Sequence, residues 1–160
     1  MARQSISKDV LLDGTQMALA GLLAGIMSFL KERGIPIKDW VGYIGQQFDG
    51  ALVDMEGESV EYVMSHLLTF QVLPLGAEVV SSTASDDKAE VVLTSLPSSS
   101  VLKKFGTTPR ELLGGFKVTP REFASIYAMY EPAAEAIGLR FTHEFRDGKQ
   151  YLRLEKAALR

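Results

Sequence analysis

The chain has 160 residues, of which 46% are hydrophobic and 23% are charged, and its formal net charge is −3. Such a composition is typical of one globular domain with one core, and it provides no basic field for binding nucleic acid. No cysteine is present, which excludes disulfides, thiolate zinc sites, iron–sulfur clusters and a cysteine nucleophile. We therefore expect a single domain over residues 1–160, with a flexible tail at residues 1–6.

The first predicted element is a long helix over residues 10–33, capped by Ser7 and ended by Gly34 and Pro36. Small residues recur along it at spacings of four, three, four and three, so they form one narrow ridge. These residues are Gly14, Ala18, Gly21, Gly25 and Ser28. Each glycine in a helix costs roughly 0.5–1 kcal/mol against alanine, so close packing is the expected compensation. The ridge can pack inside the monomer, form a cavity wall, or meet a second copy, and we predict a homodimer.

The longest apolar run of this helix, residues 17–30, is shorter than a bilayer span, and Asp9 and Asp13 precede it. We expect no membrane span and a cytoplasmic protein.

Two more helices are predicted, over residues 38–54 and 58–70, with Gly57 between them. The apolar residues recur at helical spacing in both. The predicted buried positions are Trp40, Val41, Ile44, Phe48, Ala51, Leu52 and Met55 in the first helix, and Val60, Val63, Met64, Leu67 and Leu68 in the second.

The pattern then changes from helical to alternating, which predicts a β-hairpin over residues 78–95. A tight turn at Asp86 and Asp87 places Val80 opposite Leu93 and Ala84 opposite Ala89. Leu96-Pro97 marks the exit from the hairpin.

The tetrapeptide TPRE occurs twice, at residues 108–111 and 119–122. Each copy has the pattern of a capping box, with Thr at N-cap, Pro at N1 and Glu at N3. We predict a short helix closed by Gly114-Gly115, then a helix that continues to Ile137 with a bend at Pro132.

Asp147-Gly148 is a preferred pair for a two-residue hairpin turn and predicts a closing hairpin. This register places Phe145 opposite Gln150, His143 opposite Leu152 and Phe141 opposite Leu154. On the other face, Arg140 lies opposite Glu155 and Thr142 opposite Arg153. The predicted fold is therefore α+β: three N-terminal helices, a β-hairpin, two helices and a β-hairpin, with a four-stranded antiparallel sheet covered by helices.

Two stretches carry a family resemblance: GAEVVSSTASDDKAEVVLTSLPSS, and FASIYAMYEPAAEAIGLRFTHEFRDGKQYLRLEK. Their pattern is a hairpin, a helix with an Ala134-Glu135-Ala136-Ile137-Gly138 turn, and a closing hairpin with Gly148 in its turn. It resembles the 4-vinyl reductase domain and the related aminothiazoline-carboxylate hydrolases, which share their architecture with transport protein particle subunits. The resemblance covers residues 76–156 and implies a dimeric fold with a hydrophobic small-molecule or lipid cavity.

Those families usually carry cysteines where this chain has Leu96-Pro97 and Lys149-Gln150-Tyr151. Thiol chemistry therefore cannot be transferred to this protein, and a binding or regulatory role is favoured over catalysis.

The aromatic residues and the two histidines are the candidate ligand contacts. Tyr62 and His66 follow Glu58 at intervals of four, which fits either a hydrogen-bonded row or solvated surface. His143 lies on an apolar strand face, where it is either a structural histidine or a ligand contact. The full candidate set is Trp40, Tyr43, Phe48, Tyr62, His66, Tyr127, Tyr130 and His143, although aromatics on amphipathic helices also fill cores.

No serine has the setting of a hydrolase nucleophile, and the glycines of residues 42–45 lack the context of a phosphate loop. We expect no catalytic residue, no metal and no cofactor. The predicted function is a sensory or binding domain for a small apolar or aromatic molecule. The alternatives are a homodimeric scaffold protein without a ligand and a cysteine-independent hydrolase.

Overall fold

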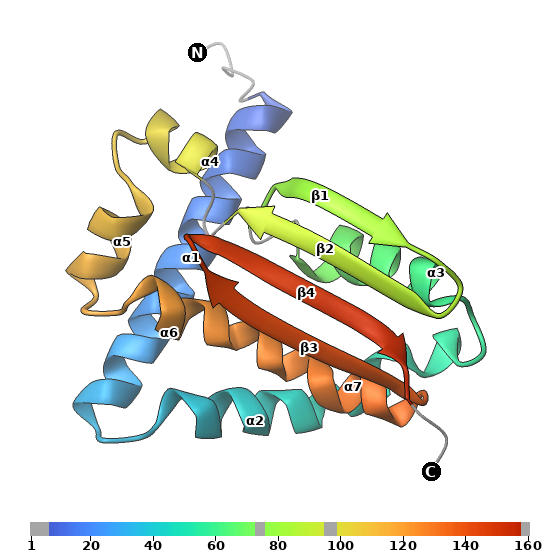
Figure 1. Ribbon diagram of the computed structural model, residues 1–160. Coiled ribbons are helices and arrows are strands. Elements are labelled where there is room, and N and C mark those ends of the chain that lie inside the picture. The colour runs from blue at the N-terminus through green and yellow to red at the C-terminus, as the bar shows by residue number, and fades with distance from the viewer. Residues whose placement is uncertain (1–6, 73–75, 95–98, 158–160) are drawn as a thin grey trace, which may run out of the picture.

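The computed structural model describes residues 7–72, 76–94 and 99–157, and it has the α+β architecture that the sequence predicts (Figure 1). The helical elements precede and separate two β-hairpins. In chain order, the elements are α1 (Lys8–Glu32), α2 (Ile37–Gln47), η1 (Asp49–Met55), α3 (Val60–His66), η2 (Leu67–Val72), β1 (Val79–Ala84), β2 (Lys88–Thr94), α4 (Ser99–Lys104), α5 (Pro109–Gly115), α6 (Pro120–Ala124), η4 (Ser125–Tyr130), α7 (Glu131–Ala136), β3 (Leu139–Arg146) and β4 (Lys149–Lys156).

The four strands form one antiparallel sheet in the order β1-β2-β4-β3, so the two hairpins meet through β2 and β4. The helices lie on one face of this sheet, with α3 behind β1 and β2 and α7 behind β3 (Figure 1). The helix α1 packs against α2, α4, α5 and α6. The inward side chains of β2, β3 and β4 form one core with the helices, because alternate residues of a strand face the same side.

The predicted register of the closing hairpin is confirmed at each of its five pairs, including His143 opposite Leu152. Its turn residues Asp147 and Gly148 both have positive φ, at 51° and 70°. A two-residue turn of type I′ needs this conformation at both positions, which explains the Asp-Gly pair.

The first hairpin differs from its prediction at one end. Ala84 pairs with Ala89 as expected, but a bulge between Val79 and Ser81 makes Val79, not Val80, the partner of Leu93. A bulge adds one unpaired residue to a strand. The sequence of this strand contains no glycine or other turn residue that would predict the bulge. The exit of this hairpin at Leu96-Pro97 lies outside the described residues, as does the tail at residues 1–6.

The predicted helix over residues 38–54 is divided at Phe48, where α2 ends and the 3₁₀ segment η1 begins. The tighter winding of a 3₁₀ segment changes the face that each later residue presents. Val41, Leu52 and Met55 are buried as predicted, whereas Ala51 is exposed and Phe48 is 49% exposed. The prediction that Phe48 and Ala51 are buried is therefore wrong.

The helices predicted over residues 58–70 and from residue 119 to Ile137 are present, but neither is a continuous α-helix. The third helix begins at Val60 after the N-cap Ser59, and its end is a π-helical segment, η2. Glu58 precedes the helix, so it does not continue a helical row with Tyr62 and His66. The last predicted helix is α6, the 3₁₀ segment η4 and α7 in succession, and Pro132 belongs to the first turn of α7.

Both TPRE motifs form capping boxes, as predicted. In the second, Thr119 Oγ1 accepts a hydrogen bond from the Glu122 amide at 3.1 Å, and Glu122 accepts one from the Thr119 amide at 2.8 Å. Lys31 of α1 forms an ion pair with Glu122 at 2.9 Å. The start of α6 is thus fixed to the end of α1.

Candidate functional site

Three of the predicted ligand residues meet between η4 and β3. The ring centroids of Tyr127 and His143 are 6.4 Å apart, and those of Tyr130 and Phe141 are 5.9 Å apart with an edge-to-face geometry. Phe141 and His143 stack along β3 with centroids 6.5 Å apart. The packing of a helical segment on a strand thus collects four rings, three of which were predicted as candidates.

His143 is held in this cluster by two polar neighbours. Its Nδ1 lies 3.3 Å from the side-chain nitrogen of Gln150 on β4, and its Nε2 lies 3.8 Å from Glu131 of α7. The side chain is 19% exposed, and this burial lowers the pKa of His143 below its ordinary value. The imidazole is therefore neutral near pH 7, and its contact with Glu131 is not an ion pair there.

The cluster contains two buried polar atoms that have no hydrogen-bond partner among the described residues: the Tyr127 hydroxyl and Gln150 Oε1. Each residue is 1% exposed. Burial also raises the pKa of Tyr127 above its ordinary value, so its hydroxyl stays protonated. A buried donor or acceptor without a partner is rare in proteins and points to a bound water or ligand group.

Gln150 was not predicted as a site residue. The signal was present, because the hairpin register puts this amide on the apolar face opposite Phe145.

A surface groove of about 650 Å³ runs over the sheet, and its lining includes His143 of the cluster together with Leu152, Tyr151 and Arg153 of β4. On the helical side of the cluster, a crevice of about 10 Å³ is lined by Tyr130, Phe48, Leu52 and Met129 among others. A volume of that size holds at most one water molecule.

The remaining predicted ligand residues do not join the cluster. Tyr43 and Tyr62 are both exposed. Trp40 packs at the edge of the core, and His66 is half-buried at the end of α3. These residues were grouped as candidates by residue type alone, and in the structure they do not form one site.

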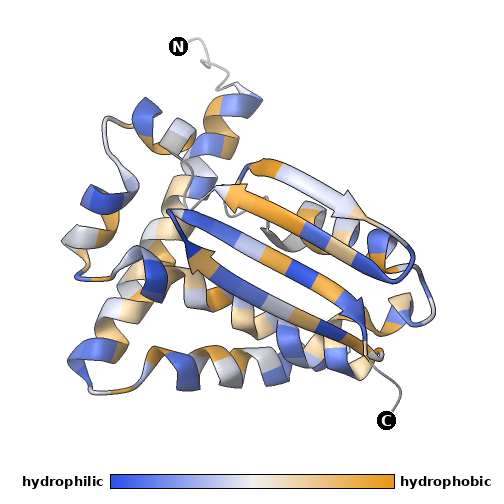
Figure 2. Ribbon diagram, viewed as in Figure 1, coloured by the Kyte–Doolittle hydropathy of each residue, from blue (hydrophilic) through white to orange (hydrophobic). Residues whose placement is uncertain are grey.

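The second unusual feature is the outward face of α1. Leu11, Leu22 and Phe29 are 54%, 60% and 53% exposed. They follow one another along the helix with Gly14, Ala18 and Gly25 between them, at steps of three or four residues, so all six share one side. We call these six residues the α1 stripe. The opposite side of α1 carries the buried residues Ala20, Ala24 and Met27, so both sides of the helix are apolar, as Figure 2 shows along its middle.

The predicted ridge of small residues overlaps this stripe, because Gly14, Ala18 and Gly25 belong to both. A Cβ atom placed on Gly14 or Gly21 would meet no atom of the described residues within 4 Å, apart from its own stretch of helix. At Gly25 it would meet Phe116 at 3.6 Å, which is ordinary contact. The described part of the monomer therefore does not pack closely against Gly14 and Gly21.

Among the described residues, α1 is also the one helix long and apolar enough to cross a membrane. Its most apolar 18-residue window has a mean hydropathy of 1.6, and 17% of this window is buried. Length and composition alone are weak evidence for a span.

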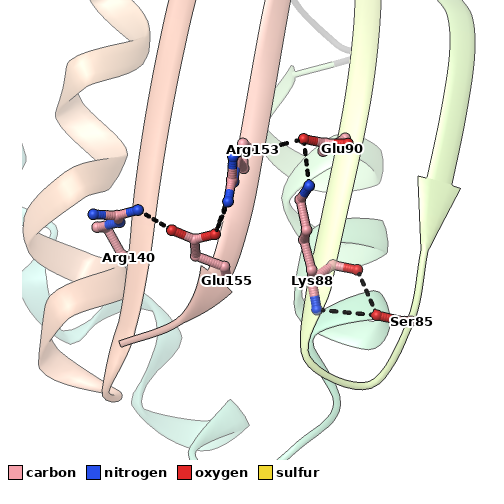
Figure 3. Close-up of polar contacts among 6 residues, drawn as sticks. All are labelled: Ser85, Lys88, Glu90, Arg140, Arg153 and Glu155. Atoms are coloured by element: carbon pink, nitrogen blue, oxygen red, sulfur yellow. Dashed lines mark hydrogen bonds and ion pairs between the residues drawn. The ribbon is translucent and has the colours of Figure 1, made fainter. Parts of the chain in front are cut away.

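The uncovered face of the sheet is charged. Arg153 of β4 pairs with Glu155 of the same strand and with Glu90 of the neighbouring strand β2 (Figure 3). Glu155 also pairs with Arg140 of β3, and Glu90 pairs with Lys88 at 2.7 Å. Alternating signs across three strands form a solvated network. This network therefore carries charges of both signs rather than a cluster of one charge.

In the described part of the chain, no group of three His, Asp or Glu side chains is arranged to hold a metal ion. The described polar neighbours of His143 are Gln150 and Glu131, so no serine or threonine is placed for activation by it.

Comparison of the sequence with models of known protein families found no match, and comparison with curated proteins also found none. The features above therefore define an α+β protein with an exposed apolar helix and a buried aromatic–histidine cluster.

Proposed function

We propose that this protein is a homodimeric interaction module, whose two copies associate through the α1 stripe. The observation that carries the proposal is the position of Leu22, which is 60% exposed in the middle of the stripe. A contiguous apolar surface of this kind marks an interaction site in a soluble protein.

The order of residues along the stripe suits a two-fold axis. If two α1 helices cross antiparallel near Ala20, Leu22 lies against Ala18 of the partner subunit, and Leu11 lies against Phe29 of the partner subunit. Leu22 then packs against a small residue in the middle of the contact, and Leu11 and Phe29 form an apolar pair at each end. The stripe is roughly 27 Å long at 1.5 Å per residue, which provides a continuous helix contact.

Sedimentation velocity at micromolar concentration tests this proposal. We expect a dimer for the native chain and a monomer for Leu22→Glu, because the new carboxylate would be buried against an apolar helix. Val53→Glu is the matched control, since Val53 is 51% exposed on η1, away from the stripe. A native monomer, or a Leu22→Glu variant that remains dimeric, would overturn the proposal.

A lipid bilayer is the competing partner for the same face. Flotation with neutral phosphatidylcholine vesicles separates the two, because a dimer with its stripes covered stays with the soluble fraction. Flotation of the native chain that Leu22→Glu abolishes would assign α1 to the membrane instead.

We propose as a second function that the cluster at His143 binds a small aromatic molecule carrying a hydroxyl group. The Tyr127 hydroxyl and Gln150 Oε1 support it, because one can donate to and the other can accept from such a group. The aromatic rings around them suit an aromatic ligand. The dimeric fold with a hydrophobic cavity, implied by the resemblance to the 4-vinyl reductase domain, belongs to the same proposal.

Native mass spectrometry of the purified protein tests the second function. A co-purified small molecule, lost in Gln150→Leu, would support it. Saturable binding of added phenol, measured by calorimetry, would support it in the same way. Release of no molecule and absence of saturable phenol binding would overturn it, and neither outcome bears on the dimer.

A further inference from the structure

The two TPRE motifs, 11 residues apart in the sequence, line one surface groove. The groove has a volume of about 450 Å³ and lies between the starts of α5 and α6 and the closing hairpin. The Thr, Pro and Arg of each motif line it, together with Phe145 and Gly148. Both copies of the repeat therefore line the same groove. Helix capping alone does not require this, because each cap would work equally well if the two helix starts lay far apart.

The floor of the groove is apolar and rigid. The pyrrolidine rings of Pro109 and Pro120 are fixed at the first helical position of α5 and α6. Phe145 is half-buried on the inward face of β3, near the end of the sheet. These three rings can receive one bulky apolar side chain.

The walls of the groove carry positive charge. Arg110 and Arg121 occupy the same position in the two motifs, are exposed, and form no ion pair with any described residue. The neighbouring carboxylates are already engaged, because Glu111 and Glu122 accept the hydrogen bonds of their capping boxes and Glu122 also pairs with Lys31. The capping hydrogen bonds occupy the backbone amides of Thr108, Glu111, Thr119 and Glu122, and the two guanidinium groups are charged donors at the groove.

The sequence around the groove has the same sign. Residues 99–122, which hold both motifs, contain five Lys or Arg and two Glu, which gives a net charge of +3 in a chain whose total is −3. An anionic partner is therefore attracted to this part of the surface before contact is made.

We propose that this groove binds an acidic peptide segment of a partner protein, with a bulky apolar side chain between its carboxylates. The apolar side chain lies over Pro109, Pro120 and Phe145. The flanking carboxylates pair with Arg110 and Arg121, whose planar guanidinium groups match a carboxylate through two parallel hydrogen bonds.

Fluorescence anisotropy with a labelled peptide EEFEE at physiological salt tests this proposal on the full chain. We expect saturable binding, weakened about tenfold in the double variant Arg110→Gln/Arg121→Gln. Lys103→Gln is the matched control, because it removes a positive charge from α4 without touching the groove, and it should leave the affinity nearly unchanged. The peptide EEGEE should bind about tenfold more weakly than EEFEE, because it lacks the apolar anchor.

Four results would overturn the proposal. These are no saturable binding of EEFEE, an equal loss in Lys103→Gln and the double arginine variant, equal binding of the uncharged peptide QQFQQ, and tighter binding of a single-stranded oligonucleotide than of EEFEE. The dimer proposal is tested separately, because Leu22→Glu lies outside the groove and should bind EEFEE as the native chain does.

Discussion

The side-chain nitrogen of Gln150 lies 3.3 Å from Nδ1 of His143, so a buried amide on β4 holds the imidazole of β3. With the amide donating, Nδ1 accepts and the ring proton is on Nε2, toward Glu131. This arrangement requires a neutral imidazole, which agrees with the lowered pKa that burial gives His143.

This relationship predicts how stability depends on pH. The folded pKa of His143 is below the value of about 6.5 in the unfolded chain, so the unfolded state binds the proton more tightly. Stability from this group is complete above pH 6.5 and is lost as pH falls from there toward the folded pKa. The raised pKa of Glu131, caused by burial and by Glu135, acts with the opposite sign.

The measurement is urea unfolding between pH 7.5 and 5.5 for the native chain and for His143→Gln. The native chain should lose more free energy of unfolding over this range than the variant does. Identical pH profiles for the two proteins would contradict the prediction.

The unpaired hydroxyl of Tyr127 predicts an unusual result for Tyr127→Phe. Removing a buried hydroxyl that lacks a partner should stabilise the protein by up to about 1 kcal/mol, because the cost of desolvating it disappears. Chemical denaturation measures this change. A loss of about 1 kcal/mol instead would mean that the hydroxyl is hydrogen-bonded to a tightly held water or ligand.

Two helical glycines should respond in opposite ways to alanine. A Cβ atom at Gly45 would lie 3.0 Å from the carbonyl oxygen of Met129 and 3.2 Å from Pro132, so Gly45→Ala should destabilise the protein by about 1–3 kcal/mol. A Cβ atom at Gly21 meets open space, so Gly21→Ala should stabilise it by about 0.5–1 kcal/mol through helix propensity. Thermal unfolding of both variants tests this prediction. It would be contradicted if both substitutions raised, or both lowered, the melting temperature.

The two capping boxes predict graded losses of stability. Thr108→Ala and Thr119→Ala each remove an N-cap and should cost roughly 0.5–2 kcal/mol. The loss should be greater for Thr119→Ala, because Glu122 of its box also pairs with Lys31 of α1. Thermal shifts measure both changes, and a shift of zero for Thr119→Ala would show that this cap contributes nothing.

The closing hairpin and the two capping boxes, which depend on residues close together in the sequence, were predicted correctly. The Asp147-Gly148 turn determines the whole register of the closing hairpin, because strand alternation has a period of two and one face must be apolar. The capping boxes likewise need only residues within one turn of helix. The helix breaks at Phe48 and after Ala124 were missed, because the same apolar spacing fits an α-helix and a 3₁₀ segment until a neighbour selects one.

The candidate site shows the same division. Residue type identified Tyr127, Tyr130 and His143, and the hairpin register placed His143 on the inward face. Only the packing of η4 on β3 brought the three together. Tyr43 of α2 and Tyr62 of α3 are exposed, which their residue type does not indicate.

By itself, the sequence determined the α+β class, the strand register of the closing hairpin, the helix caps and the apolar character of α1, because each follows from a local period or a local hydrogen bond. Only the tertiary structure decided which side of α1 is covered, which glycine is tightly packed, and that the two TPRE motifs face one groove. Those outcomes depend on where elements distant in the chain come to rest. Gly45 and Gly21 are both helical glycines and cannot be distinguished in the sequence. They differ in the structure because Met129 lies against Gly45, whereas no described residue outside its own helix lies against Gly21.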